Sequence, residues 1–261
     1  MLKSRYSPVE SIKIMGHASK QAMGPNIEVL LWNVFKCQKK GWQRDFETLI
    51  DGKDLILFQE SILNSPFDSQ FTQSIQHQWM MARSFKHLKT NIETGVKTGS
   101  TVAASKHSFS ASLHAEPLSN TKKMLLATEY PLLGLKTSAP EPEQSLLVVN
   151  THMINFVTFK KFKAHLDQVF ETLEHHTGPL ILAGDFNTWN GKRLKYFNLL
   201  AKSCLLEEAK MLRQPRFNHL FQHLDHLYYR GLEAINAHVH TDIHSSDHYP
   251  ISLSLRLILN N

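Results

Sequence analysis

The sequence predicts an α+β fold in which two stacked β-sheets are flanked by helices. Segments typical of strands outnumber those typical of helices, and no internal repeat or low-complexity tract interrupts them. The chain has 261 residues, 42% of them hydrophobic, which is enough to bury one large two-layer core. We therefore expect one domain over residues 27–261, preceded by an N-terminal extension over residues 1–26.

Runs of apolar, β-branched and aromatic residues predict the strands of these sheets. The predicted strands cover residues 27–33, 55–59, 79–85, 99–105, 122–130, 145–152, 179–184, 224–229, 235–240 and 249–257. The Arg230-Gly231 pair predicts a hairpin turn between two of them.

The clearest helix is predicted over residues 159–175, because its apolar residues recur every three or four positions. These residues are Phe159, Phe162, Leu166, Val169, Phe170 and Leu173, and their stripe is typical of a face packed on a core. Shorter helices are expected over residues 43–50, 69–75 and 191–201.

Composition excludes several classes of protein. The two cysteines, Cys37 and Cys204, form neither a disulfide framework nor a zinc-ribbon pattern. No segment approaches the ~20 consecutive apolar residues of a membrane span, and residues 1–26 contain no uninterrupted apolar stretch typical of a signal peptide. We expect a cytoplasmic monomer.

Polar residues follow the predicted strand that ends near residue 184. Asp185 and Asn187 are two positions apart, so their side chains can share one face, and Gly184 permits close backbone approach. This pattern is typical of a catalytic carboxylate with an orienting partner. Asp and Asn are also common turn formers, so an ordinary exit from a strand is the alternative.

Other predicted strands end on similar residues. Asn33 closes the first strand, Glu60 follows a second, His152 closes a third, and Asp247-His248 precedes the last. Glu60 could instead be a helix cap, His152 a core histidine and Asp247 a turn residue. Their joint occurrence at strand ends favours a functional site.

Motifs of other enzyme classes are absent from the sequence. It contains no GxSxG elbow, no GxxxxGK phosphate loop and no GxGxxG fingerprint. The run Ser246-Asp247-His248 cannot be a hydrolase triad, because adjacent residues of a strand project to opposite faces. The sixteen histidines suggest zinc, and His238 and His240 could share a face, but no third ligand has a recognisable spacing. Scattered surface histidines explain them better.

The order of these motifs resembles the endonuclease/exonuclease/phosphatase, or DNase I-like, superfamily. The matching motifs are Trp32-Asn33, Gln59-Glu60, Asn150-Thr151-His152, Gly184-Asp185-Phe186-Asn187, Leu224-Asp225 and Ser246-Asp247-His248. The resemblance spans about Ile27 to Leu257 and is strongest to the bacterial YafD-like branch. It implies a four-layered α/β/β/α sandwich and a metal-dependent hydrolase acting on phosphate esters.

The resemblance also implies a role for each residue. The divalent ion, Mg²⁺ or Mn²⁺, would be held by Glu60 with Asn33 and Asp247. Asp185 would deprotonate the attacking water, and Asn187 would hold that water or a phosphate oxygen. His248 and His152 would donate to the non-bridging oxygens, and Asp225 would fix the tautomer of His248 and raise its pKa.

Two positions are less clear within the resemblance. Phe35 stands where the apurinic-endonuclease branch has an acid, so a second metal at that residue is not expected. Asn155 stands near the position of a phosphate-binding Asn in that branch, but it equally fits an Asx turn before the helix at residue 159.

Charge favours an anionic substrate. The formal net charge is +6 and basic residues form two clusters near the expected rim: Lys36, Lys39, Lys40 and Arg44, and then Lys192, Arg193 and Lys195. Trp189 could stack on a base. We expect nucleic acid as the substrate. The alternatives are a small phosphorylated metabolite or lipid headgroup, and a non-catalytic binding module on the same fold.

Overall fold

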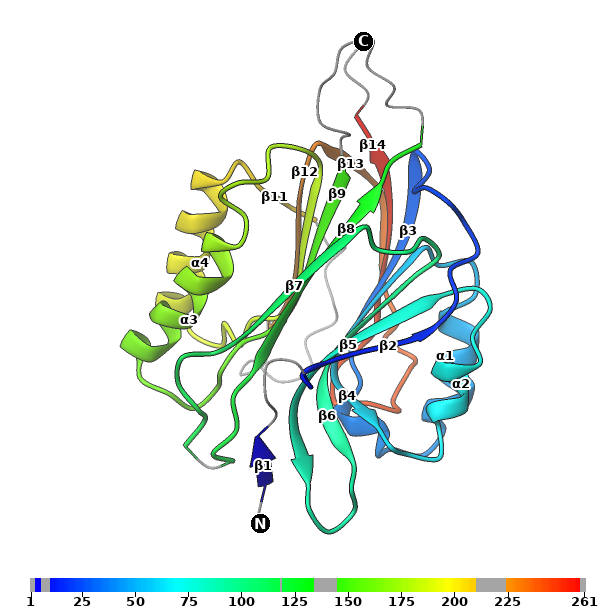
Figure 1. Cartoon of the computed structure of the whole chain (residues 1–261). Coiled ribbons are helices and arrows are strands. Elements are labelled where there is room, and N and C mark those ends of the chain that lie inside the picture. Colours follow the sequence, from blue (N-terminus) through cyan, green and yellow to red (C-terminus); the bar gives the residue numbers. More distant parts are fainter. Residues whose placement is uncertain (1–2, 6–9, 118, 134–144, 210–223, 259–261) are drawn as a thin grey trace.

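Two β-sheets pack face to face with helices on both outer faces, as Figure 1 shows. The computed structural model describes residues 3–5, 10–117, 119–133, 145–209 and 224–258. Helices α1 and α2 cover one outer face, and α3 and α4 cover the other (Figure 1). This arrangement confirms the predicted α+β fold with four layers.

The first sheet has the strand order β1-β5-β6-β4-β3-β14-β13, with β2 also paired to β5. Its central strands β3 and β4 are parallel, so both end at the same edge. The bounds are β1 Lys3–Arg5, β2 Ile12–Gly16, β3 Asn26–Asn33, β4 Leu55–Leu63, β5 Gln78–His87, β6 Glu93–Ser100, β13 Leu232–Val239 and β14 Ile251–Leu257.

The second sheet has the order β11-β12-β10-β9-β8-β7. Its parallel pair is β9 and β10, so these strands also end together. The bounds are β7 Lys106–Ala111, β8 Met124–Pro131, β9 Ser145–His152, β10 Leu180–Asp185, β11 Glu207–Glu208 and β12 Asp225–Arg230.

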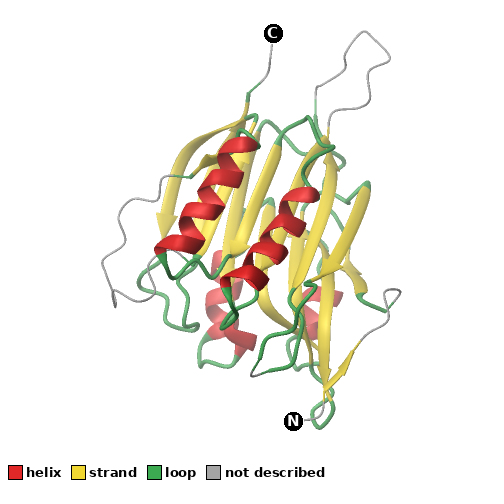
Figure 2. Ribbon diagram, turned by 90° about the vertical axis from the view of Figure 1, so that its left-hand side faces the viewer, coloured by secondary structure: helices red, strands yellow, loops and turns green. Residues whose placement is uncertain are grey.

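Helices α3 (Phe159–Glu171) and α4 (Gly191–Ser203) lie side by side on the second sheet, as the turned view of Figure 2 shows. The predicted stripe of α3 is buried there through residues such as Phe162, Leu166 and Val169. On the other side, α1 (Trp42–Leu49) and α2 (Asp68–Thr72) bury aromatic rings against the first sheet. A short 3₁₀ turn, η1 (Phe35–Cys37), follows β3.

The core between the sheets is mainly apolar and includes a buried pair of amide side chains. Branched side chains from both sheets form a single cluster. Within it, Asn150 accepts a hydrogen bond from Gln59 Nε2 at 2.7 Å, and its own Nδ2 donates to the backbone oxygens of Phe58 and Lys97. Because a buried amide needs partners, this pair fixes how the sheets register on each other.

Several strands differ from the prediction. Residues 12–16, within the segment expected to be an extension, pair with β5, and residues 106–111 form an edge strand beside β8. The first is only five residues long and the second is polar, and both are partly exposed, so neither has the long apolar run that predicts a strand. The strand expected at residues 99–105 lies instead at 93–100. In the part of the chain that the structure describes, no helix is long and apolar enough to cross a membrane.

Candidate active site

Strand register brings three predicted residues into one row. Asp185, the last residue of β10, is paired with His152 of β9 and with Asp225 of β12. Paired strands lie about 4.8 Å apart, so side chains on the shared face are within reach of one another. The row faces the gap between the sheets at the edge where β3 and β4 also end.

Asp185 Oδ2 is the meeting point of this site. Asn33 Nδ2, from the first sheet, donates to it at 3.1 Å. His152 Nε2 lies 3.4 Å from the same oxygen and His248 Nε2 lies 3.9 Å from it. The other ring nitrogen of His248, Nδ1, is 2.6 Å from Asp225 Oδ2. Residues from three other motifs therefore converge on the Asp185 carboxylate.

The loop that carries His248 is tied to the end of β3. Ser246 Oγ donates to the backbone oxygen of Asn33 at 2.6 Å, and Trp32 Nε1 donates to the backbone oxygen of His248 at 3.1 Å. Lys39 Nζ donates to the backbone oxygen of Ser246 at 2.6 Å. These contacts fix the imidazole, and Ser246 is a positioning residue to which the sequence assigned no role.

Burial and charge separate the protonation states of the three titrating groups. Burial, with a further contribution from Asp225, raises the pKa of Asp185 above its usual range, against opposing effects of His248 and an N–H bond. Burial alone would lower the pKa of His248, but Asp225 and Asp185 raise it to about 10. Burial and the nearby Lys123 hold the pKa of His152 well below its usual value. At neutral pH His248 is a cation and His152 is neutral.

Asn187 positions Asp185. Its backbone N–H donates to Asp185 Oδ1 at 3.0 Å, and its side-chain Nδ2 donates to the backbone oxygen of Met153 at 3.0 Å. The side chain is buried, and the backbone has a φ of 51°, a conformation that Asn tolerates better than most residues. In this structure Asn187 therefore holds the Asp185 carboxylate in place through its backbone N–H.

Glu60 lies at an irregularity of β4, where the pairing with β6 shifts register between Phe58 and Ser61. Its carboxylate forms ion pairs with Lys36 and, at 3.7 Å, with Lys123. Burial raises the pKa of Glu60, but the two lysines outweigh that effect and lower it. Glu60 is therefore an ionised carboxylate.

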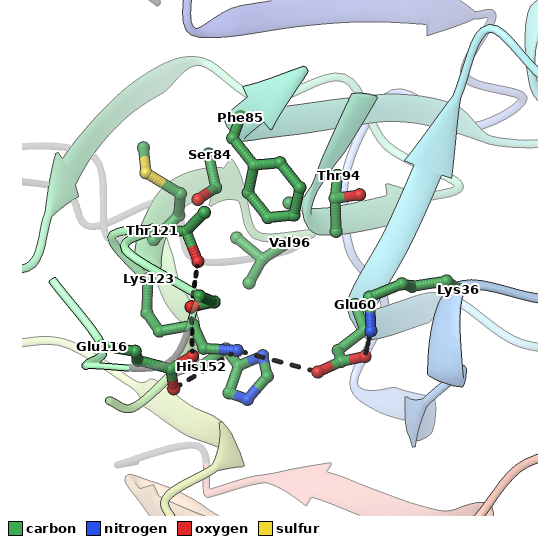
Figure 3. A pocket seen from close by; sticks show the side chains of 13 residues that line it. Lys36, Glu60, Ser84, Phe85, Thr94, Val96, Glu116, Thr121, Lys123 and His152 are labelled. Carbon is green, nitrogen blue, oxygen red and sulfur yellow. Dashed lines mark hydrogen bonds and ion pairs between the residues drawn. The ribbon is translucent and has the colours of Figure 1, made fainter. Parts of the chain in front are cut away.

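A pocket of about 200 Å³ opens beside Glu60. Figure 3 shows Lys123 extending between Glu116 and Glu60, with His152 below them and the ring of Phe85 above. Ser84, Thr94 and Thr121 add hydroxyl groups to the lining. Because His152 also contacts Asp185, the pocket adjoins the row formed by His152, Asp185 and Asp225.

The predicted substrate residues Trp189 and Asn155 contact each other. Trp189 Nε1 donates to Asn155 Oδ1 at 2.9 Å, and the indole is 45% exposed. The same oxygen of Asn155 accepts from the backbone N–H of the next residue, Phe156, at 2.8 Å, which is not the bond to residue i+2 that defines an Asx turn. These residues form an aromatic rim on the loops that follow β9 and β10.

Arg193, predicted to contact substrate, is instead buried under the rim. Its side chain is 1% exposed, and its guanidinium donates to the backbone oxygens of Asn187 and Val157 at 2.9 and 3.0 Å. A residue at the first turn of α4 was expected to face solvent, but this one lies between aromatic rings of Phe162 and Trp189. Arg193 therefore supports the Asp185 loop and the rim.

Several residues of the two basic clusters already have partners within the protein. Lys36 pairs with Glu60, Arg44 with Asp45, and Lys39 with the backbone near His248. Lys192 is exposed, with its ammonium 4.3 Å from the centre of the Phe159 ring. Of the pair Lys192 and Arg193, only Lys192 remains available to a polymer.

Oxygen ligands for a hard cation lie close together. The carboxylates of Asp185 and Asp225 each offer an oxygen, and a ring nitrogen of His248 lies within 4.8 Å of both. Because His248 is held as a cation, it donates and does not ligate. Among the described residues Asp225 Oδ1 is buried without a hydrogen-bond partner, and Glu60 is an ionised carboxylate beside this row. Such a set fits Mg²⁺ or Mn²⁺, which prefer few carboxylates and retained waters. Asp247 is exposed, and its carboxylate accepts a bond from Ser246 Oγ at 3.3 Å.

The zinc alternative finds no support among the described residues. The rings of His238 and His240 stack edge to face at 4.6 Å, and no cluster of three ligands includes them. His240 Nε2 instead lies 2.8 Å from Ser252 Oγ.

Sequence comparison relates the chain to known proteins. The sequence profile described as the Endonuclease/Exonuclease/phosphatase family matches residues 30–248. A UPF0294 protein of Vibrio parahaemolyticus is 27% identical over 256 residues, covering 95% of this chain and 85% of that protein. A UPF0294 protein of Erwinia tasmaniensis is 30% identical over 231 residues, covering 87% and 80%.

Solved structures share the fold at low identity. An endonuclease/exonuclease/phosphatase from Beutenbergia cavernae has a TM-score of 0.68 at 15% identity, over 89% of this chain and 72% of that one. D. rerio TDP2, complexed with a single-strand DNA product, has a TM-score of 0.61 at 10% identity, over 88% and 99%. A mannosyl-6-phosphatase of Bacteroides thetaiotaomicron has a TM-score of 0.59 at 14% identity, and the match covers 88% of this chain and 99% of that one. With its six motifs in order on this fold, the chain belongs to the endonuclease/exonuclease/phosphatase family.

Proposed function

We propose that the protein is a divalent-metal-dependent phosphoesterase that hydrolyses a phosphodiester by attack of water. The observation that carries the proposal is the convergence of Asn33, His152 and His248 on Asp185 Oδ2. A buried carboxylate with a raised pKa, beside a cationic imidazole, supplies a base and a donor within one site.

Asp185 accepts the proton of the attacking water. Its raised pKa makes it a better base at neutral pH than an ordinary Asp, and the amides of Asn33 and Asn187 hold its two oxygens. His248 donates from Nε2 to a non-bridging oxygen, and Asp225 keeps it charged through Nδ1. A divalent ion bound at Glu60 would neutralise charge on the phosphoryl oxygens.

We propose nucleic acid as the substrate class. Trp189 supports this proposal, because its exposed indole is held at Nε1 by Asn155 and packed against the guanidinium of Arg193. A fixed aromatic ring stacks on any unpaired base. The net charge of +6 and the exposed Lys192 favour a phosphate backbone in the same way.

The second candidate is a small phosphorylated metabolite or lipid headgroup. The pocket beside Glu60 favours it, since 200 Å³ is about the volume of seven liquid waters and suits a compact polar group. The mannosyl-6-phosphatase of B. thetaiotaomicron shows that this fold can serve such a substrate.

A hydrolysis screen tests the proposal. A chromogenic phosphodiester, a single-stranded oligonucleotide and a hexose phosphate are each incubated with Mg²⁺, with Mn²⁺ or with EDTA. We expect metal-dependent cleavage of the chromogenic ester and the oligonucleotide, abolished in Asp185→Asn. Turnover of the hexose phosphate alone would replace the nuclease with the second candidate. Absence of all turnover at every metal concentration would favour a binding module.

Binding measurements separate the rim residues from the chemistry. Trp189→Ala should weaken single-stranded DNA binding by about 1–3 kcal/mol. Lys192→Ala should reduce the slope of log K against log[salt] by about 0.7. Lys202→Ala, at the other end of α4, is the matched control and should leave that slope unchanged. Salt-independent binding by the wild type would contradict a backbone contact.

A further inference from the structure

The charges that line the pocket beside Glu60 are paired with one another. Lys36 contacts Glu60 Oε2, Lys123 lies 3.7 Å from Glu60 Oε1, and Lys123 also lies 3.6 Å from Glu116 Oε1. The side chains are only partly accessible, at 34% for Lys36, 18% for Glu60 and 16% for Lys123. Figure 3 shows them as one connected chain of groups.

These pairs leave the described lining without net charge. Two ammonium groups face two carboxylates, and His152 is neutral because burial lowers its pKa. A phosphate entering this pocket would meet lysines whose charge is already compensated at short range, so its electrostatic gain would be small. The pocket in this state is a poor anion site despite its two lysines.

Both oxygens of Glu60 are occupied by cationic groups. Lys36 contacts Oε2 and Lys123 lies 3.7 Å from Oε1, so a divalent ion at this carboxylate competes with an ammonium group for its negative charge. Lys123 has a second carboxylate, Glu116, to hold it in place. The side-chain ion pair that the structure gives for Lys36 is with Glu60 alone, and Lys36 is the more exposed of the two.

The backbone at Lys36 aims its side chain at Glu60. Phe35, Lys36 and Cys37 all have positive φ, between 45° and 57°. This is an unusual conformation for three successive residues other than glycine, and it costs free energy that the ion pair helps to offset. Release of the ion pair therefore also frees the η1 turn to relax.

We propose that Lys36 is an exchangeable cation: it occupies Glu60 before a divalent ion binds, and it then moves to the phosphoryl oxygens of the substrate. Lys123 stays with Glu116 and completes the phosphate contact. The inference rests on the proposed metal site at Glu60. Because binding linkage is reciprocal, the divalent ion and the phosphoryl group then strengthen each other's binding.

Metal titration without substrate tests the first half. Mn²⁺ binding is measured by calorimetry for wild type, Lys36→Met, Lys40→Met and Glu60→Gln. Removing the competing ammonium should tighten Mn²⁺ binding by about tenfold, the scale of one charged hydrogen bond. Lys40→Met removes an exposed charge from the same segment and should change it by less than about twofold. Lys36→Gln is the second variant should Lys36→Met fold poorly.

Phosphate binding tests the second half. Inorganic phosphate is titrated into the Mg²⁺-saturated protein, where Lys36→Met should bind it about tenfold more weakly than wild type does. One substitution thus strengthens metal binding and weakens phosphate binding, whereas a damaged site would weaken both. Unchanged or weaker Mn²⁺ binding in Lys36→Met, with Glu60→Gln losing the ion, overturns this inference alone. Unchanged Mn²⁺ binding in Glu60→Gln overturns the metal site on which it rests.

Discussion

The two sheets contribute to the site in different ways. On the second sheet, His152, Asp185 and Asp225 occupy consecutive strands in exact pairing, so regular hydrogen bonding of the backbone sets their spacing. On the first sheet, Glu60 lies at a register shift with a φ of 50°, and the η1 turn beside it has positive φ throughout. Regular strand pairing thus sets the residue positions on the second sheet, whereas irregular backbone sets them on the first sheet.

This difference matches the demands of the chemistry. Proton transfer requires groups held within hydrogen-bond reach, and a paired sheet holds them with little freedom. A metal and a phosphate must enter and leave, and an irregular segment with exchangeable ion pairs permits that. Under the proposed mechanism, the regular second sheet is the rigid half, which carries the base Asp185 and the Asp225 that orients His248. The irregular segment of the first sheet is the adjustable half, which carries the ligand contacts.

Removing the base on the rigid half has the largest expected effect. Asp185→Asn should lower kcat by roughly 10² to 10⁴, the contribution typical of a positioned general base. Because the pKa of Asp185 is raised by burial, its ionised form is disfavoured in the folded state, so the variant should be no less stable at pH 8. Steady-state kinetics and a thermal melt measure the two effects. Loss of stability together with activity would assign Asp185 a structural role.

Breaking the strand register should be the next largest effect. A Cβ on Gly184 would lie 1.9 Å from the backbone oxygen of Thr151, so Gly184→Ala must push β10 away from β9. We expect a loss of about 1–3 kcal/mol in the free energy of unfolding, as for other overpacked cores. Gly191→Ala, where a Cβ meets nothing within 4 Å, is the matched control and should be neutral or stabilising in urea denaturation. Equal effects of the two substitutions would contradict a register constraint.

A smaller effect concerns the first sheet, where Lys97 is fully buried. Its ammonium lies 3.3 Å from the centre of the Phe71 ring and donates to the backbone oxygen of Ile62. Burial lowers the pKa of Lys97 from 10.5 to about 7, although the nearby Cys37 and Asp68 oppose that shift.

Above pH 7 the unfolded chain therefore binds one more proton at Lys97 than the folded chain does, so this residue makes stability rise with pH. Burial raises the pKa of Cys37 to about 12 from 9.0, which acts in the opposite direction above pH 9. Between pH 7 and 9, Lys97→Met should show a smaller rise in unfolding free energy than wild type. Urea denaturation at pH 7 and at pH 9 measures the unfolding free energy of each protein, with Lys122→Met as the control. An identical pH dependence in Lys97→Met would show that Lys97 is not titrating there.

Much of the rigid half was predictable from the sequence. Asp185, His152 and Asp225 stand next to apolar runs, and the alternation of side chains in a strand places them on shared faces. The helix of residues 159–171 and its buried stripe follow from spacing in the same way. Such positions can be predicted because they depend on the local spacing of residues and on the pairing of neighbouring strands.

The adjustable half was not predictable. Lys123 reaches Glu60 and Glu116 through contacts between distant segments, and a lysine before a strand carries no signal of such partners. Arg193 looked like a solvent-facing residue of a basic cluster, because sequence does not show the aromatic rings that enclose it. Ion pairs across loops depend on the positions of both ends, which no periodicity encodes.

The most direct test of the account is a double-mutant cycle on Asp225 and His248 with a pH–rate profile. If Asp225 holds His248 as the charged donor, Asp225→Asn should shift the alkaline limb to lower pH, since it removes the group that raises the pKa of His248. His248→Ala should cost roughly 10² to 10³ in kcat, and the double variant should cost no more than that, because the two residues act as one unit. An unshifted alkaline limb with additive losses would contradict the account.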